Sequence, residues 1–206
     1  MSAATLWRTR YILVPGFLVA LASAAALGAM CLSPPAYQPV EYRPPALPAP
    51  QYAPPPPPAP VERHLTLEQR QRRWWPVVRR LARRYGLDPA LVMSLIMVES
   101  RFDPRAVSPK GAMGLMQVLP DTAAQLGVSD PLDPRANLEA GIRYLAWLKR
   151  QFKGDLVLAL AAYNAGPTKV ATLGTVPDHR ETRRFVVKVL SQVDYFRQNF
   201  QSLARR

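Results

Sequence analysis

The chain has 206 residues, 49% of them hydrophobic, which is enough for one globular domain with extensions. Lysines and arginines total 27 against 14 acidic residues, and a net charge of +13 would attract a polyanion. The single cysteine excludes an intrachain disulfide, and the two histidines lie too far apart in sequence for zinc-ligand spacing.

Residues 1–32 have the pattern of a membrane anchor or a secretory signal. Arg8 and Arg10 precede an uncharged run at residues 11–32, which as a helix would span roughly 33 Å and cross a bilayer. The basic flank predicts a cytoplasmic amino terminus, which places the rest of the chain on the far side of the membrane. The alanine-rich end of the run equally fits a cleaved signal. A lipid-modified Cys31 is a third alternative, disfavoured by the bulky residue before it.

Residues 33–63 are expected to be a linker that joins this segment to a domain at residues 64–206. Thirteen prolines lie within residues 33–60, which lack the apolar content of a core. In polyproline geometry, at about 3.1 Å per residue, this stretch would reach roughly 85 Å. It would act as a semi-rigid spacer between the membrane and a distant target.

The first helix of the domain is predicted to open with a capping box. Thr66 and Gln69 have the T-x-x-Q spacing, and Pro76 should kink or restart the helix. Apolar residues then follow at helical spacing among seven arginines. This basic surface would attract a wall glycan with acidic peptides, anionic lipid or nucleic acid, or it is a solvated helix face. The exporting amino terminus disfavours nucleic acid as a partner.

The central helix is predicted from Asp88 and Pro89 to about residue 100, with its end marked by Asp103 before Pro104. Residues 91–98 are apolar except for one serine, which a helix tolerates only when most of its surface is covered. Glu99 falls on the same stripe as these apolar side chains. Desolvation and the negative end of the helix dipole should both raise its pKa, although the nearby Arg101 could oppose them.

A loop follows, in which Pro109 and Gly111 suit a tight turn and Gly114 permits a close backbone approach. A loop of this kind can line a groove beside the acid.

Further helices are predicted at residues 120–126, from Asp133 to about 152, from Asp155 to about 166, and at 167–173. The last should begin near Asp178, where Asp178 and Glu181 have capping-box spacing. No segment alternates with the period of a strand, so the fold class is mainly α.

Four short motifs occur in an order and spacing that resembles the soluble lytic transglycosylase family. They are ES at residues 99–100, GLMQ at 114–117, AYNAG at 162–166 and ETR at 181–183. The resemblance covers roughly residues 74–200 and implies a lysozyme-like fold. It also implies a murein lyase that needs no cofactor and cleaves between N-acetylmuramic acid and N-acetylglucosamine, forming 1,6-anhydromuramic acid. Phe185 stands where the family usually has tyrosine after ETR.

The resemblance implies that Glu99 is the sole catalytic acid and base. It further implies that the matching residues bind substrate, and these are Ser100, Met116, Gln117, Tyr163, Asn164 and Glu181. Simpler roles also fit some of them. Met116 is a flexible filler, Asn164 a left-handed residue at a helix end, and Glu181 a capping residue.

Two other functions stay open. A muramidase would hydrolyse the same bond and need a second carboxylate, for which Asp103 and Asp121 are candidates, although turn and helix-start roles explain both. A catalytically idle scaffold would bind peptidoglycan within an envelope assembly. The expected partners are thus peptidoglycan glycan strands, the inner membrane through the amino-terminal segment, and envelope-assembly proteins.

Overall fold

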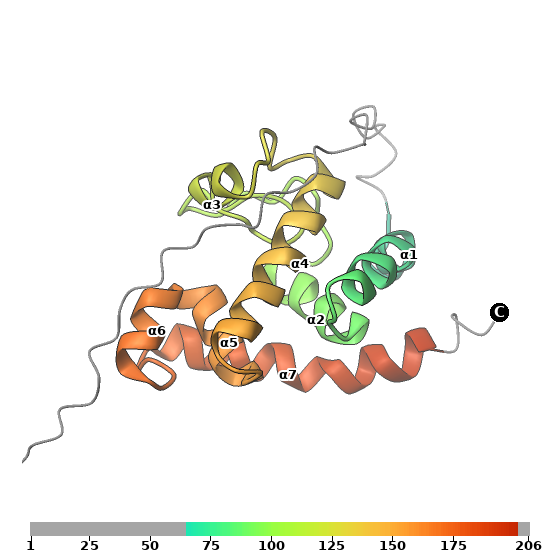
Figure 1. Ribbon diagram of the computed structural model, residues 1–206. Coiled ribbons are helices and arrows are strands. Elements are labelled where there is room, and N and C mark those ends of the chain that lie inside the picture. Colours follow the sequence, from blue (N-terminus) through green and yellow to red (C-terminus); the bar gives the residue numbers. More distant parts are fainter. Residues whose placement is uncertain (1–64, 202–206) are drawn as a thin grey trace, which may run out of the picture. The chain divides into compact units, whose positions relative to one another are not determined.

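A computed structural model of the chain (Figure 1) describes residues 65–201, so the expected anchor and linker lie outside the described residues. Within them the chain forms these helices: α1 (Leu67–Arg84), α2 (Pro89–Glu99), α3 (Pro120–Gln125), α4 (Pro134–Gln151), α5 (Leu156–Ala165), α6 (Pro167–Leu173) and α7 (Arg180–Gln201). Residues 65–201 contain two isolated β-bridges and no strand, which confirms a mainly helical domain. Of these helices, none combines the length and apolar character needed to span a bilayer.

Four helix starts follow the predicted caps. The Thr66 hydroxyl accepts from the Gln69 amide at 3.2 Å, and the Gln69 side chain accepts from the Thr66 amide at 2.8 Å. Asp88, Asp133 and Asp155 each accept amide protons in the first turn of the helix that follows. These bonds satisfy amides that the helix itself leaves without partners.

Pro76 does not restart α1, which runs through it as one helix. Proline removes an amide donor and so frees the carbonyl one turn earlier. Because Pro76 lies on the exposed side of α1, water can replace that lost hydrogen bond.

The capping box predicted at the start of α7 is wrong. The helix begins at Arg180, so the N-cap position falls at His179, and the Asp178–Glu181 spacing is one residue out of register. The Asp178 carboxylate instead accepts from the Arg183 guanidinium. Glu181 forms an ion pair with Lys110 at 3.6 Å.

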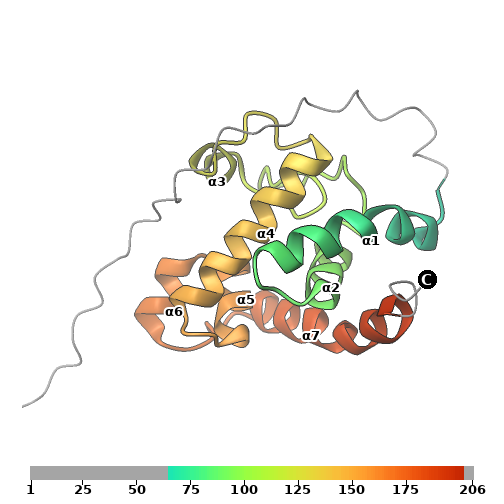
Figure 2. The same ribbon diagram turned by 45° about the vertical axis from the view of Figure 1, so that its right-hand side comes forward.

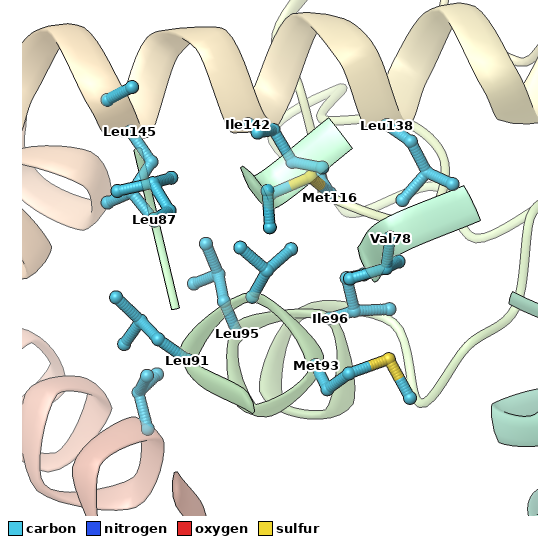
Figure 3. Close-up of a cluster of buried hydrophobic side chains, with 14 of the residues drawn as sticks. Val78, Leu87, Leu91, Met93, Leu95, Ile96, Met116, Leu138, Ile142 and Leu145 are labelled. Atoms are coloured by element: carbon cyan, nitrogen blue, oxygen red, sulfur yellow. The ribbon is translucent and has the colours of Figure 1, made fainter. Parts of the chain in front are cut away.

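α2 is the central helix, as predicted. Seven of its residues, 90–96, are buried. It packs against α1 and α7, and in Figures 1 and 2 α7 runs beneath both α2 and α5. In Figure 3, Leu95 and Ile96 face Leu138 and Ile142 of α4 across the core. This packing makes the end of α2 a rigid platform for the residue found there.

Candidate active site

α2 ends abruptly at Glu99. Arg101 and Phe102 have φ angles of 53° and 62°, the left-handed region that costs a non-glycine residue roughly 1–2 kcal/mol. Phe102 is fully buried and packs on Phe196 of α7, with ring centroids 6.1 Å apart. The helix ends one residue before the predicted end at about residue 100, and burial of Phe102 stabilises the left-handed turn that follows it.

The Glu99 side chain lies partly buried at this helix end. It makes no hydrogen bond or ion pair with any residue between 65 and 201, and the exposed Arg101 does not pair with it. Burial raises the pKa of Glu99 to about 8, as expected from its place on the apolar stripe. At neutral pH the carboxyl is therefore mostly protonated and can donate a proton.

The GLMQ loop is held by Asn137, a fully buried residue of α4. Its side-chain oxygen accepts from the Met116 amide at 2.8 Å. Its side-chain nitrogen donates to the carbonyls of Met113 and Pro131 at 2.8 and 2.7 Å. A Cβ at Gly114, whose φ is 75°, would lie 2.5 Å from the Asn137 nitrogen. The close approach predicted for Gly114 is confirmed, and its partner is Asn137.

Met116 does not line a surface. Its side chain is fully buried, and in Figure 3 it lies beside Ile142 under α4. A Cβ on Gly141 of α4 would lie 2.6 Å from the Met116 Cβ, so the backbone of α4 and the loop approach each other closely here. The expected contact between this side chain and substrate is therefore wrong in this conformation. Met116 contributes main-chain groups, and its side chain fills the core.

Tyr163 connects α5 to this loop. Its hydroxyl donates to the Met116 carbonyl at 2.8 Å. Burial, followed by the nearby charges of Glu99 and Tyr144, raises the pKa of Tyr163 well above 10. The hydroxyl therefore stays neutral, within electrostatic reach of Glu99.

Ser100 and Gln117 also join this region. The Ser100 hydroxyl donates to the Leu115 carbonyl at 2.7 Å, which ties the end of α2 to the loop. Gln117 has a φ of 48°, and its amide nitrogen donates to the carbonyls of Ala106 and Gly114 at 3.1 and 3.0 Å. The amide oxygen of Gln117 has no hydrogen-bond partner within residues 65–201.

The AYNAG and ETR motifs meet through Thr182. This buried hydroxyl donates to the Asn164 side-chain oxygen at 2.9 Å. Asn164 lies inside α5 and is not left-handed, so that interpretation is wrong. The positive φ of 90° falls at Gly166, where glycine has no Cβ to clash.

Glu181 lies apart from this cluster of contacts. Its side chain is 68% exposed and joins the site only through its ion pair with Lys110 of the turn before the GLMQ loop. Phe185, which replaces the family's usual tyrosine, is buried at 7% exposure. The structure thus brings Glu99, Ser100 and Tyr163 together around the loop, and leaves Glu181 at its edge.

Sequence reasoning missed Asn137 and Thr182. Both are buried polar residues that hold the motif residues in place. Each could have been recognised in the sequence as an amide or hydroxyl side chain on the apolar face of an amphipathic helix. Such a side chain is expected to be buried, and buried polar groups normally have hydrogen-bond partners.

A family model described as "Transglycosylase SLT domain" matches residues 76–186. A membrane-bound lytic murein transglycosylase F from Desulfosudis oleivorans is 32% identical over 155 residues, 69% of this chain and 34% of that protein. A transglycosylase from Enterobacteria phage PRD1 is 36% identical over 121 residues, 59% and 43% of the two chains.

Among solved structures, an inactive glutamate-to-glutamine mutant of the lytic transglycosylase Slt from Pseudomonas aeruginosa has a TM-score of 0.54 and 31% identity. The match covers 61% of this chain and 24% of that one. The chain thus spans less than half the length of these relatives.

Proposed function

This chain belongs to the Transglycosylase SLT domain family, and on that premise we propose that it is a peptidoglycan lytic transglycosylase. It would cleave the β-1,4 bond between N-acetylmuramic acid and N-acetylglucosamine and form 1,6-anhydromuramic acid. The observation that carries the proposal is the Glu99 carboxyl, which is unpaired within residues 65–201 and has a pKa of about 8 at the end of the central helix. A lone proton donor suits a reaction that needs no activated water.

In the proposed reaction Glu99 serves twice. As an acid it gives its proton to the glycosidic oxygen while the bond from that oxygen to the anomeric carbon breaks. As a base it then takes the proton of the muramic acid C6 hydroxyl, whose oxygen attacks the anomeric carbon and closes the anhydro ring. The substrate's own acetamido group would relieve the cationic intermediate. Hydrolysis would instead use a second carboxylate.

Neither candidate second carboxylate is favoured by its surroundings. Asp103 accepts from the Arg105 amide at 2.9 Å, as expected of a turn residue. Asp121 is exposed in the first turn of α3. We therefore keep hydrolysis as an outcome to be tested.

We assign substrate contacts to polar groups that have no partner within residues 65–201. These are the Gln117 amide oxygen and the Asn164 amide nitrogen. Tyr163 would hold the loop in register with Glu99, as would Ser100 through its bond to the Leu115 carbonyl. Glu181, being exposed, would contact a more distant part of the glycan.

The proposed location is the periplasm, with an amino-terminal helix in the inner membrane or a cleaved signal, and a proline-rich linker before the domain. Arg8, Arg10 and the uncharged run at residues 11–32 support it. The relative from Desulfosudis oleivorans carries the description "membrane-bound". Envelope-assembly proteins are the further partners that such a location would allow.

The test is mass spectrometry of the products that the full chain releases from purified sacculi. We expect anhydro-muropeptides from the parent and none from Glu99→Gln, with Asp103→Asn as a matched carboxylate control that keeps activity. Reducing muropeptides, one water heavier, would identify a muramidase. Binding to sacculi without any release would identify a scaffold.

A further inference from the structure

α1 presents a strongly basic surface that the proposed reaction does not use. The helix contains seven arginines and one glutamate, so its net charge is +6. The arginine face, as we call it, consists of Arg70, Arg72, Arg73, Arg79, Arg80, Arg83 and Arg84.

Helical spacing places these arginines opposite the side of α1 that packs on the domain. The buried residues are Gln71, Trp74, Trp75, Val78, Leu81 and Ala82. At 100° per residue they occupy one arc of the helix, and the arginines occupy the other half. The result is a continuous cationic stripe along the helix.

Part of this charge is already compensated inside the domain. Arg72 pairs with Glu68 at 2.8 Å, and Arg84 pairs with Glu139 at 3.4 Å. Arg73 lies over the Trp74 ring at 5.6 Å.

Four further arginines have no acidic partner within residues 65–201, and these are Arg70, Arg79, Arg80 and Arg83. Arg83 follows Arg80 by three residues and Arg79 by four, a spacing at which like charges on a helix repel one another, so an anionic ligand would stabilise them.

The chemistry of the face selects the kind of ligand. Trp74 and Trp75 are each only 7% exposed, so the aromatic residues of α1 serve the core and cannot insert into a lipid surface. What remains is guanidinium groups alone, and their planar fork matches carboxylates in bidentate geometry. The cell-wall polymer of the proposed function carries peptides whose carboxylates repeat along each strand.

We propose that the arginine face binds these peptide carboxylates and retains the domain on uncleaved polymer. The inference rests on the proposed function for the identity of the polymer. Weak contacts repeated along one strand would raise the effective concentration of glycan at Glu99 without touching the reacting sugar.

The test compares binding of the full chain to intact sacculi, in a Glu99→Gln background so that the polymer is not cleaved. One variant carries Arg79→Gln, Arg80→Gln and Arg83→Gln. A matched control carries Arg150→Gln, Lys153→Gln and Lys188→Gln, which removes three exposed charges elsewhere. We expect the first variant to bind roughly tenfold more weakly than the parent, because it loses three exposed ion pairs that each contribute modestly. The control should bind about as well as the parent. The difference should shrink at high salt and on sacculi stripped of peptides.

Equal binding of parent and variant would overturn the proposal and leave a solvated helix face. Equal weakening by both triple variants would also overturn it, as would a loss that persists on peptide-free glycan. Weaker binding to anionic lipid vesicles with unchanged binding to sacculi would identify a membrane surface as the partner.

Failure of the proposed function is detected separately. With Glu99 intact, parent and arginine variant should cleave peptide-free glycan at equal rates. If the parent also releases no product from intact sacculi, the lyase assignment is refuted. The binding comparison would still report on the arginine face.

Discussion

Replacing Glu99 by glutamine should change stability in a way that depends on pH. Glutamine has nearly the shape of the protonated acid but cannot ionise. In the parent, burial raises the pKa of Glu99 from 4.5 to about 8. Between these two values the native state holds a proton that the unfolded chain has released, so parent stability falls as pH rises through this window. Glu99→Gln lacks this dependence.

The size of the effect follows from the shift. Moving this pKa from 4.5 to about 8 corresponds to on the order of 5 kcal/mol, since one pH unit is worth about 1.4 kcal/mol. Because solvent reaches part of the side chain, we expect the variant to gain between about 2 and 5 kcal/mol over the parent at pH 8 to 9. Near pH 4 the two proteins should be equally stable.

Denaturant unfolding of both proteins across this pH range measures the difference directly. Product release by the parent should decline as pH rises through about 8, because the acid loses its proton. If the stability difference stayed constant from pH 4 to 9, the carboxyl would be solvated and the proposed proton donor would lose its physical basis.

Three further substitutions test the support of the GLMQ loop by denaturant unfolding. Gly114→Ala should lower the free energy of unfolding by at least about 2 kcal/mol more than Gly127→Ala does. Both glycines have a positive φ, but only at Gly114 would the added Cβ collide, 2.5 Å from the Asn137 side-chain nitrogen. Equal losses of stability would contradict the collision. Asn137→Ala should destabilise by at least about 2 kcal/mol, because it leaves buried main-chain groups unpaired; a neutral result would show that water replaces them. Tyr163→Phe should cost about 1–2 kcal/mol and slow product release, through loss of the bond to Met116; full stability would assign the tyrosine no role in holding the loop.

Local sequence patterns were sufficient for most helix starts and for the central acid. Asp88 and Asp133, each followed by proline, begin helices in the structure as predicted. Glu99 could be placed on the apolar stripe from spacing alone, and its pKa is raised accordingly. Such features depend on residues within one or two turns. The capping box predicted at Asp178 failed because α7 begins at Arg180, one residue later than the Asp178–Glu181 spacing requires.

A helical domain with a desolvated acid at the end of its central helix could be predicted from residue order, because helical periodicity and capping act over a few residues. The inward turn of Met116, and the bonds by which Asn137 and Tyr163 hold its main chain, depend on how distant segments pack. Those bonds join residues 21 and 47 positions apart. The packing of α4 and α5 against the loop selects these partners, and no local spacing encodes which buried polar group will meet which carbonyl.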